Sequence, residues 1–217
     1  LDVFVASFRR TDGLDPTALF IQDDAGNFSP EYLITDNHHS FSQVSRLLGD
    51  ERKFLLVTGP NNKFPFGVYE FGSDLTVDLT DQVGLPRTTD VSDVAIADFT
   101  GDALVDVFLV RSDSHDELAD RFLTRLNGQG EFVNRSGAAG LEVTGCQSIG
   151  AGDFDNDGDL DAYLSCGLYD QGVGINYPNI LYENQGGGVF KRAPAAGGAE
   201  GTDEGCGEGV AVADFNN

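Results

Sequence analysis

The chain has 217 residues and a formal net charge of −23, from 36 acidic and 13 basic side chains. Nucleic acids and anionic membrane surfaces repel so acidic a chain, and we expect neither as a partner. Hydrophobic residues make up 40% of the sequence, and no apolar run reaches the roughly 18 to 20 residues of a membrane span. The composition therefore predicts a folded domain that does not insert into membranes.

Strand-like runs separated by turn residues occupy residues 1–90. Residues 18–28 and 67–75 each consist of two short β-rich runs joined by glycine and polar residues, which is the pattern of a hairpin. Residues 41–57 have the pattern of a strand, a loop and a strand, and Lys53 lies where later copies carry an acidic residue. We interpret Lys53 as a solvated surface lysine and predict no metal site in this loop.

Residues 94–110 form the first strand, loop, strand unit that keeps its acidic residues. Calcium prefers oxygen ligands, so this loop is a candidate calcium site. Ala103 stands where a glycine would ease the turn, and the loop has few charges, so we expect weak binding. The alternative is an empty acidic hairpin whose side chains are solvated. The candidate ligands are Asp98, Thr100, Asp102 and Asp106.

A second acidic loop carries carboxylates at five alternate positions, namely Asp153, Asp155, Asp157, Asp159 and Asp161. Such a cluster is repulsive without a cation, and Gly158 supplies the bend that lets a loop wrap an ion. The alternative is a strand with all five carboxylates on its solvated face. Asn156 and Gly158 oppose that alternative because both residues favour turns over strands.

The flanks of this loop exclude an EF-hand. Loop position twelve is Leu164 instead of glutamate, and neither flank has a helical period. We therefore expect a calcium loop between two strands. Its ligands would be the carboxylates of Asp153, Asp155, Asp157 and Asp161, with Asp159 giving its backbone carbonyl or an outer contact.

Two of the three cysteines, Cys146 and Cys166, stand nearly symmetrically about this acidic loop. They could form a disulfide across the hairpin, or they could be a buried pair of free thiols; the sequence leaves both open. Cys206 is then left over.

The acidic unit recurs along the chain. It begins at Asp98 and again at Asp153, and residues 209–217 begin a further copy, with Asp214 and Asn216 as its candidate ligands. Hairpin patterns follow at 121–132 and 179–190. The copies that begin at Asp98, Asp153 and Asp214 lie 55 and 61 residues apart. Strands with turn signals at such a spacing are typical of propeller blades. We predict an all-β fold, a β-propeller of about four four-stranded blades, with repeats at 1–38, 39–91, 92–144, 145–205 and, in part, 206–217.

The loop motifs resemble a known repeat. Residues 97–99 and 213–215 read Ala-Asp-Phe, and residues 152–161 read Gly-Asp-Phe-Asp-Asn-Asp-Gly-Asp-Leu-Asp. These motifs resemble the FG-GAP, or VCBS, repeats of integrin-α-like β-propellers. The run 179–190, followed by 209–215, resembles ASPIC/UnbV-type extracellular proteins.

The resemblance is strong over residues 91–217 and weak over 1–90. It implies that each acidic loop binds a structural Ca²⁺ ion, and that the protein is secreted or exposed at the cell surface. The chain has no methionine and opens within a strand-like run, so we expect an excerpt of a longer propeller. A closed four-blade ring and end-to-end complementation between chains are the alternatives.

For function, we expect a non-catalytic, calcium-binding adhesion or recognition module for protein or glycan. No nucleophile elbow, phosphate loop or zinc spacing occurs in the sequence, and His38, His39 and His115 lie in polar runs typical of the surface. One alternative is the propeller domain of a carbohydrate-active enzyme or lectin. Another is a self-assembling subunit of an extracellular filament.

Overall fold

The computed structural model describes residues 3–5, 18–23, 25–32, 41–48, 50–58, 66–70, 78–87, 91–111, 121–125, 131–141, 145–170, 173–175, 177–201 and 209–213. Within these ranges every regular element is a β-strand except one short 3-10 helix, η1 (Pro194–Gly198). The prediction of an all-β fold is thereby confirmed. The chain divides into two compact units, Leu1–Val91 and Ser92–Asn217.

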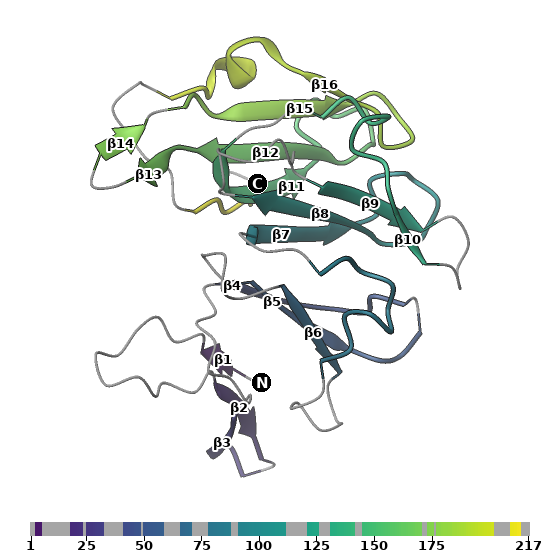
Figure 1. Cartoon of the computed structure of the whole chain (residues 1–217), viewed down its shortest axis with the longest axis vertical. Helices are drawn as coiled ribbons and strands as arrows, with labels where there is room; N and C mark the ends of the chain where they lie inside the picture. Colours follow the sequence, from purple (N-terminus) through teal and green to yellow (C-terminus); the bar gives the residue numbers. More distant parts are fainter. Residues whose placement is uncertain are drawn as a thin grey trace. The chain divides into compact units, whose positions relative to one another are not determined.

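The described residues of the first unit form two three-stranded antiparallel sheets, each in chain order (Figure 1). A fourth strand, as predicted for each blade, is not found among these residues. One sheet is formed by β1 (Val3–Val5), β2 (Ala18–Gln22) and β3 (Phe28–Tyr32), and the other by β4 (Phe41–Ser45), β5 (Phe54–Thr58) and β6 (Gly67–Glu70). Four consecutive apolar side chains of β5, from residue 54 to residue 57, are fully buried, as expected of a strand covered on both faces. Lys53 is exposed beside them.

The second unit contains two four-stranded antiparallel sheets whose strands also follow chain order (Figure 1). The first consists of β7 (Val91–Ala97), β8 (Asp106–Arg111), β9 (Arg121–Arg125) and β10 (Phe132–Asn134). The second consists of β11 (Cys146–Gly152), β12 (Asp161–Cys166), β15 (Ile180–Asn184) and β16 (Phe190–Arg192).

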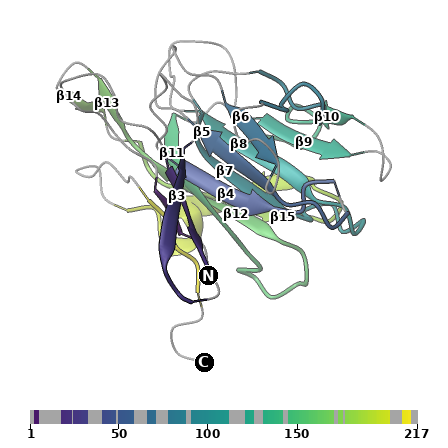
Figure 2. The same ribbon diagram turned by 90° about the horizontal axis from the view of Figure 1, so that it is seen from below.

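A two-stranded hairpin, β13 (Leu168–Asp170) and β14 (Val173–Ile175), is inserted between β12 and β15. It projects beyond the end of β12 in both ribbon views (Figure 1 and Figure 2). The four larger sheets lie in the four ranges predicted as repeats, apart from Val91 at the start of β7.

The same hydrogen bonds recur in sheets of both units. In the first unit, Val68 accepts a bond from Leu79 N (2.7 Å) and donates its own N–H to Thr80 Oγ1 (3.1 Å). In the second unit, Phe122 accepts from Arg135 N (2.8 Å) and donates to Ser136 Oγ (2.8 Å). In both sheets, a residue of the third strand is therefore bonded to two consecutive residues that come later in the chain, one through its N–H and one through its side-chain hydroxyl. The β4–β6 sheet and the β7–β10 sheet therefore share this pair of hydrogen bonds.

An aromatic cluster fills the space between the two sheets of the second unit. Phe99 is 1% exposed, and its ring centroid lies 5.9 Å from those of Phe122 and Phe190. Phe108 and Tyr182 extend the cluster along β8 and β15. Edge-to-face aromatic packing of this kind adds to the stabilisation from apolar burial. Through Phe99, the loop between β7 and β8 thus packs against aromatic residues of β15 and β16.

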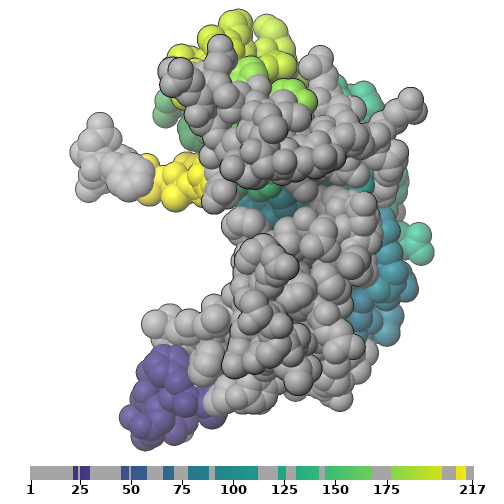
Figure 3. Space-filling model, turned by 60° about the vertical axis from the view of Figure 1, so that its left-hand side comes forward, coloured from purple at the N-terminus to yellow at the C-terminus, as the bar shows by residue number. Residues whose placement is uncertain are grey.

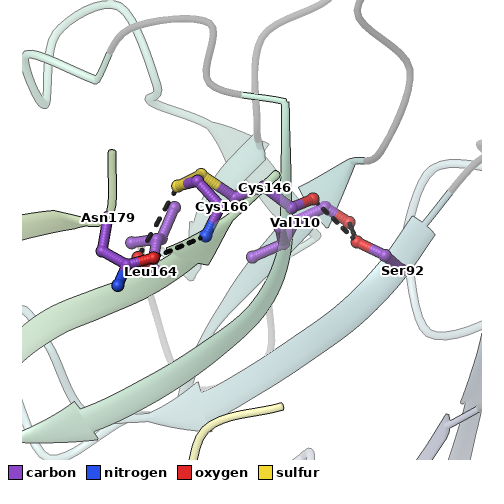
Figure 4. Close-up of a disulfide and its surroundings, with 6 residues drawn as sticks. All are labelled: Ser92, Val110, Cys146, Leu164, Cys166 and Asn179. Atoms are coloured by element: carbon purple, nitrogen blue, oxygen red, sulfur yellow. Dashed lines mark hydrogen bonds between the residues drawn. A yellow bond between two sulfur atoms is a disulfide. The ribbon is translucent and has the colours of Figure 1, made fainter. Parts of the chain in front are cut away.

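The two cysteines of the β11–β12 hairpin form a disulfide (Figure 4). Cys146 and Cys166 are directly opposite in the register of the two strands, and both are buried. The thiol alternative is therefore wrong. Cys166 N also donates to Asn179 Oδ1 (3.0 Å), and the Ser92 hydroxyl reaches Cys146 O (3.2 Å). Cys206 lies outside the described residues.

Candidate metal centre

The loop 153–161 closes the end of the β11–β12 hairpin, beyond the last strand pair, Gly152 and Asp161. Asn156 and Gly158 adopt positive φ angles of 63° and 98°. Only glycine and, less readily, asparagine or aspartate enter this left-handed region without appreciable strain. The segment is a curled loop between strands, so the alternative of a straight strand with a solvated acidic face is wrong.

Three carboxylates converge in this loop. Asp153, Asp155 and Asp161 each offer one oxygen, and these oxygens all lie within 4.8 Å of one another. Ligand oxygens lie about 2.3 to 2.6 Å from a calcium ion, so oxygens on opposite sides of one ion are about 5 Å apart. The group therefore fits a calcium ion. Asp161 is fully buried, whereas Asp153 and Asp155 are exposed.

Backbone N–H groups orient these carboxylates. Asp153 Oδ1 accepts from Asp157 N and its Oδ2 accepts from Gly158 N, both at 3.1 Å. Asp161 Oδ2 accepts from Phe154 N at 2.7 Å. Each carboxylate oxygen has a second lone pair, so these bonds leave the group able to bind a cation. Hydrogen bonds within the loop therefore fix the orientation of the Asp153 and Asp161 carboxylates.

The remaining two aspartates of the loop do not join the converging group. Asp157 Oδ1 accepts from Asp159 N at 2.9 Å, and the Asp159 carboxylate lies near Gly186 in the β15–β16 turn. The role of Asp157 as a carboxylate ligand stays a prediction. So does the role of Asp159, which would bind through its backbone carbonyl or make an outer contact. Desolvation raises the pKa of Asp155, and the negative charges of its aspartate neighbours raise it further. A bound cation would relieve that repulsion.

The loop 98–106 makes the equivalent hydrogen bonds in the preceding sheet. Asp98 accepts from three loop N–H groups, those of Gly101, Asp102 and Ala103 (2.7 to 3.1 Å). Asp106 Oδ2 accepts from Phe99 N (2.9 Å), as Asp161 does from Phe154 N. Ala103 takes a positive φ of 66° at the place of Gly158, which is strained for a residue with a Cβ.

The carboxylates of this second loop do not gather as closely. In the part of the chain that the structure describes, Asp153, Asp155 and Asp161 form the one group of three or more Asp, Glu, His or Cys side chains that converges. Asp106 is fully buried, and among the described residues neither its Oδ1 nor Thr100 Oγ1 has a hydrogen-bond partner. Buried oxygens without a partner are costly, and a cation would satisfy both.

Burial raises the pKa of Asp106 from 3.8 to about 6. The N–H groups of Thr100 and Phe99 oppose the shift, and so does the nearby Thr100 hydroxyl, although it does not meet hydrogen-bond geometry with the carboxylate. Because the folded pKa lies above the unfolded one, the protonated carboxyl stabilises the fold. This contribution is fully present below pH 3.8 and is lost as the pH rises through about 6.

We therefore predict that, with chelator present, wild-type protein loses about 1 to 2 kcal/mol relative to Asp106→Asn between about pH 4 and pH 6.5. Urea unfolding of both proteins across this range measures the difference. Asp93, whose pKa is also raised by burial, is common to both proteins and cancels. Parallel pH profiles would contradict the prediction.

The segment 209–213 packs against β11, where the predicted further copy begins. Val210 N donates to Ser148 Oγ (3.1 Å), just as Ile149 N donates to Asp93 Oδ2 (3.0 Å). A Cβ on Gly150 would lie 2.6 Å from Val210 Cγ1, so glycine permits this contact. In Figure 3 the segment, coloured yellow, lies largely exposed. Asp214, Asn216 and the three histidines lie outside the described residues.

Sequence reasoning did not single out Asn184, although the structure places it beside both loops. It lies in the predicted hairpin 179–190, and a polar residue at the end of a β-rich run is ordinarily taken for a turn residue. The signal that could have identified it is its position before the turn glycines of the run.

Comparison of the chain with models of known protein families and with curated protein sequences finds no match in either. Among the described residues, no helix has the length and apolar character needed to cross a membrane.

Proposed function

We propose that the protein is a calcium-binding, non-catalytic recognition module of the extracellular space or cell surface, built as a β-propeller of four-stranded blades. The observation that carries this proposal is the convergence of three aspartate oxygens within 4.8 Å at the end of a β-hairpin. The ion is structural in this proposal. It fixes a loop, and the surrounding loops bind a protein or glycan.

Calcium fits this group better than other common cations. All three ligands are carboxylate oxygens, which suit hard cations, whereas zinc and copper sites use histidine or cysteine. Magnesium demands near-ideal octahedral geometry, whereas calcium accepts irregular coordination in a flexible loop. The exposure of Asp153 and Asp155 leaves room for water to complete the shell.

Two further observations support the architecture and the compartment. Two consecutive four-stranded antiparallel sheets pack through a shared aromatic cluster, as blades of a propeller do. The buried disulfide between Cys146 and Cys166 is compatible with an oxidising extracellular compartment, where free calcium is also available at millimolar concentration.

The experiment is a calcium titration followed by thermal melting. With a dissociation constant of about 0.1 to 1 mM, 1 mM calcium stabilises the fold by about 0.4 to 1.4 kcal/mol per site. This corresponds to a rise in Tm of about 1 to 5 °C. We predict that Asp155→Asn abolishes the part of this rise that comes from the loop 153–161.

Chelator provides the internal check. Asp155→Asn removes one of several mutually repelling charges, so without calcium the variant is expected to melt no lower than wild type. Glu131→Gln, which removes an exposed carboxylate outside both loops, is the matched control and should keep the full calcium response. A wild-type protein whose Tm ignores calcium would refute the metal assignment.

The ligand class is tested separately. Binding on a glycan array without turnover would support a recognition module. Hydrolysis or lyase activity by this chain would instead support the propeller domain of a carbohydrate-active enzyme.

A further inference from the structure

Asn184, at the end of β15, is fully buried and has partners for all its side-chain polar atoms. Its side-chain Nδ2 donates to Phe99 O (2.7 Å) and to Leu160 O (3.0 Å). Its Oδ1 accepts from Gly186 N (3.1 Å), and its backbone N–H donates to Asp161 Oδ1 (2.8 Å). One residue thus touches both acidic loops, since Phe99 belongs to the loop 98–106 and Leu160 to the loop 153–161.

The bonds continue beyond Asn184 to the last carboxylate of each loop. Phe99, whose carbonyl receives the Asn184 amide, donates its own N–H to Asp106 Oδ2 (2.9 Å). A chain of hydrogen bonds therefore runs from Asp161 through Asn184 and Phe99 to Asp106. All four residues are at most 1% exposed. In such a dry environment, hydrogen bonds are stronger and reinforce one another.

Both ends of this chain carry an independent sign of a ligand. Asp161 is one of the three carboxylates whose oxygens converge. At the other end, Asp106 is fully buried with an Oδ1 atom that lacks a partner among the described residues. A cation that fixes either carboxylate restrains the buried peptide groups that orient the other one.

We propose that Asn184 is a positioning residue that couples the two acidic loops, so that a cation in the loop 153–161 strengthens cation binding in the loop 98–106, and the reverse. The inference rests on the proposed calcium binding. Coupling between sites commonly changes affinity by about 5- to 150-fold, and a path of several hydrogen bonds places this case near the low end. By linkage, each cation must strengthen the other by the same factor.

A purely structural asparagine makes a different prediction. If Asn184 served stability alone, its loss would lower the Tm, but each loop would keep an affinity independent of the other loop. The dependence of one site's affinity on the other site therefore separates coupling from stability.

The test is calorimetric titration with calcium chloride. Asp155→Asn disables the loop 153–161, and the affinity of the loop 98–106 is expected to fall about fivefold relative to wild type. Asp98→Asn disables the other loop, and the loop 153–161 is expected to weaken by the same factor. When each substitution is combined with Asn184→Ala, the change should shrink to less than about twofold.

Asn179→Ala is the matched control. Asn179 lies at the other end of the same strand region, and its side chain accepts from Cys166 N (3.0 Å) without reaching either acidic loop in the described contacts. The coupling should survive in this variant. If Asn179→Ala abolishes it as fully as Asn184→Ala does, the assignment to Asn184 is overturned.

A second measurement does not depend on the folding of Asn184→Ala. In the Asp98→Asn protein, calcium added to the loop 153–161 is expected to shift the NMR signals of the Asn184 side-chain amide and of Phe99 N–H. Unmoved signals would overturn the inference. Calcium binding at one loop alone, or at two independent loops, overturns the coupling and leaves the proposed function standing. No binding at either loop overturns both.

Discussion

Phe99→Ala is expected to lower the free energy of unfolding of the second unit by about 3 to 5 kcal/mol. Phe99 is 1% exposed and meets Phe108, Phe122 and Phe190 at centroid distances of 5.9 to 6.3 Å. Alanine would leave a cavity between two sheets and remove three aromatic contacts. Urea unfolding measures the loss, and the Tm should fall by about 10 °C.

Phe154→Ala is the matched control. Phe154 holds the same place in its own loop as Phe99 does, directly after the first aspartate, and donates the equivalent backbone bond to Asp161. Its side chain is nevertheless 40% exposed, with an edge contact to Tyr163. We expect a loss of about 1 kcal/mol or less. Equal losses in the two variants would contradict the packing that separates them.

These two phenylalanines show where sequence reasoning ends. The Asp-Phe motif recurs at 98–99 and 153–154, so the sequence treats both residues alike. Phe99 becomes a core residue because strands from two different sheets cover it, with Phe122 on β9 and Phe190 on β16. The burial of each phenylalanine depends on which strands pack against it, and the Asp-Phe motif does not indicate which strands those are.

The strands and hairpins were more predictable because their signals are local. Glycine and polar residues separate short β-rich runs, and the first strands of the hairpins β2–β3, β9–β10 and β15–β16 lie where those signals predict. Their second strands begin only at the last residues of the predicted ranges, 28, 132 and 190. Of the hairpin predicted at 67–75, only the first strand, β6, lies within the described residues. The acidic loops were predictable for the same reason. The carboxylates of the loop 153–161 and its turn residues, Asn156 and Gly158, stand together in one short stretch of sequence.

The detailed geometry of the loops was less accessible. The sequence predicts carboxylate ligands at 153, 155, 157 and 161, yet Asp153, Asp155 and Asp161 converge while the Asp157 Oδ1 accepts a bond from Asp159 N. The loop 98–106 has backbone N–H bonds to its first aspartate, as the loop 153–161 does. Its carboxylates do not form a converging group like that of Asp153, Asp155 and Asp161. These differences arise from backbone N–H groups that compete for each carboxylate, and residue spacing does not reveal which one succeeds.

Loss of the Cys146–Cys166 disulfide is expected to lower the free energy of unfolding by about 3 kcal/mol, from the loop-closure entropy of a crosslink with a sequence separation of 20. Urea unfolding of wild-type protein with and without reductant measures this difference in the free energy of unfolding. Cys146→Ala/Cys166→Ala should resemble reduced wild-type protein and ignore the reductant. Peptide mapping without reduction identifies the crosslinked pair directly.

The disulfide and the acidic loop stand at opposite ends of the same hairpin, since Cys146 pairs with Cys166 and Gly152 pairs with Asp161. The carboxylates are oriented by N–H groups inside the loop, such as Asp157 N on Asp153. Reduction should therefore change calcium affinity by less than about twofold while it lowers stability, because distant groups without shared partners act almost independently. A large loss of calcium affinity on reduction would mean that the crosslink, and not the loop's own hydrogen bonds, holds the ligands in place.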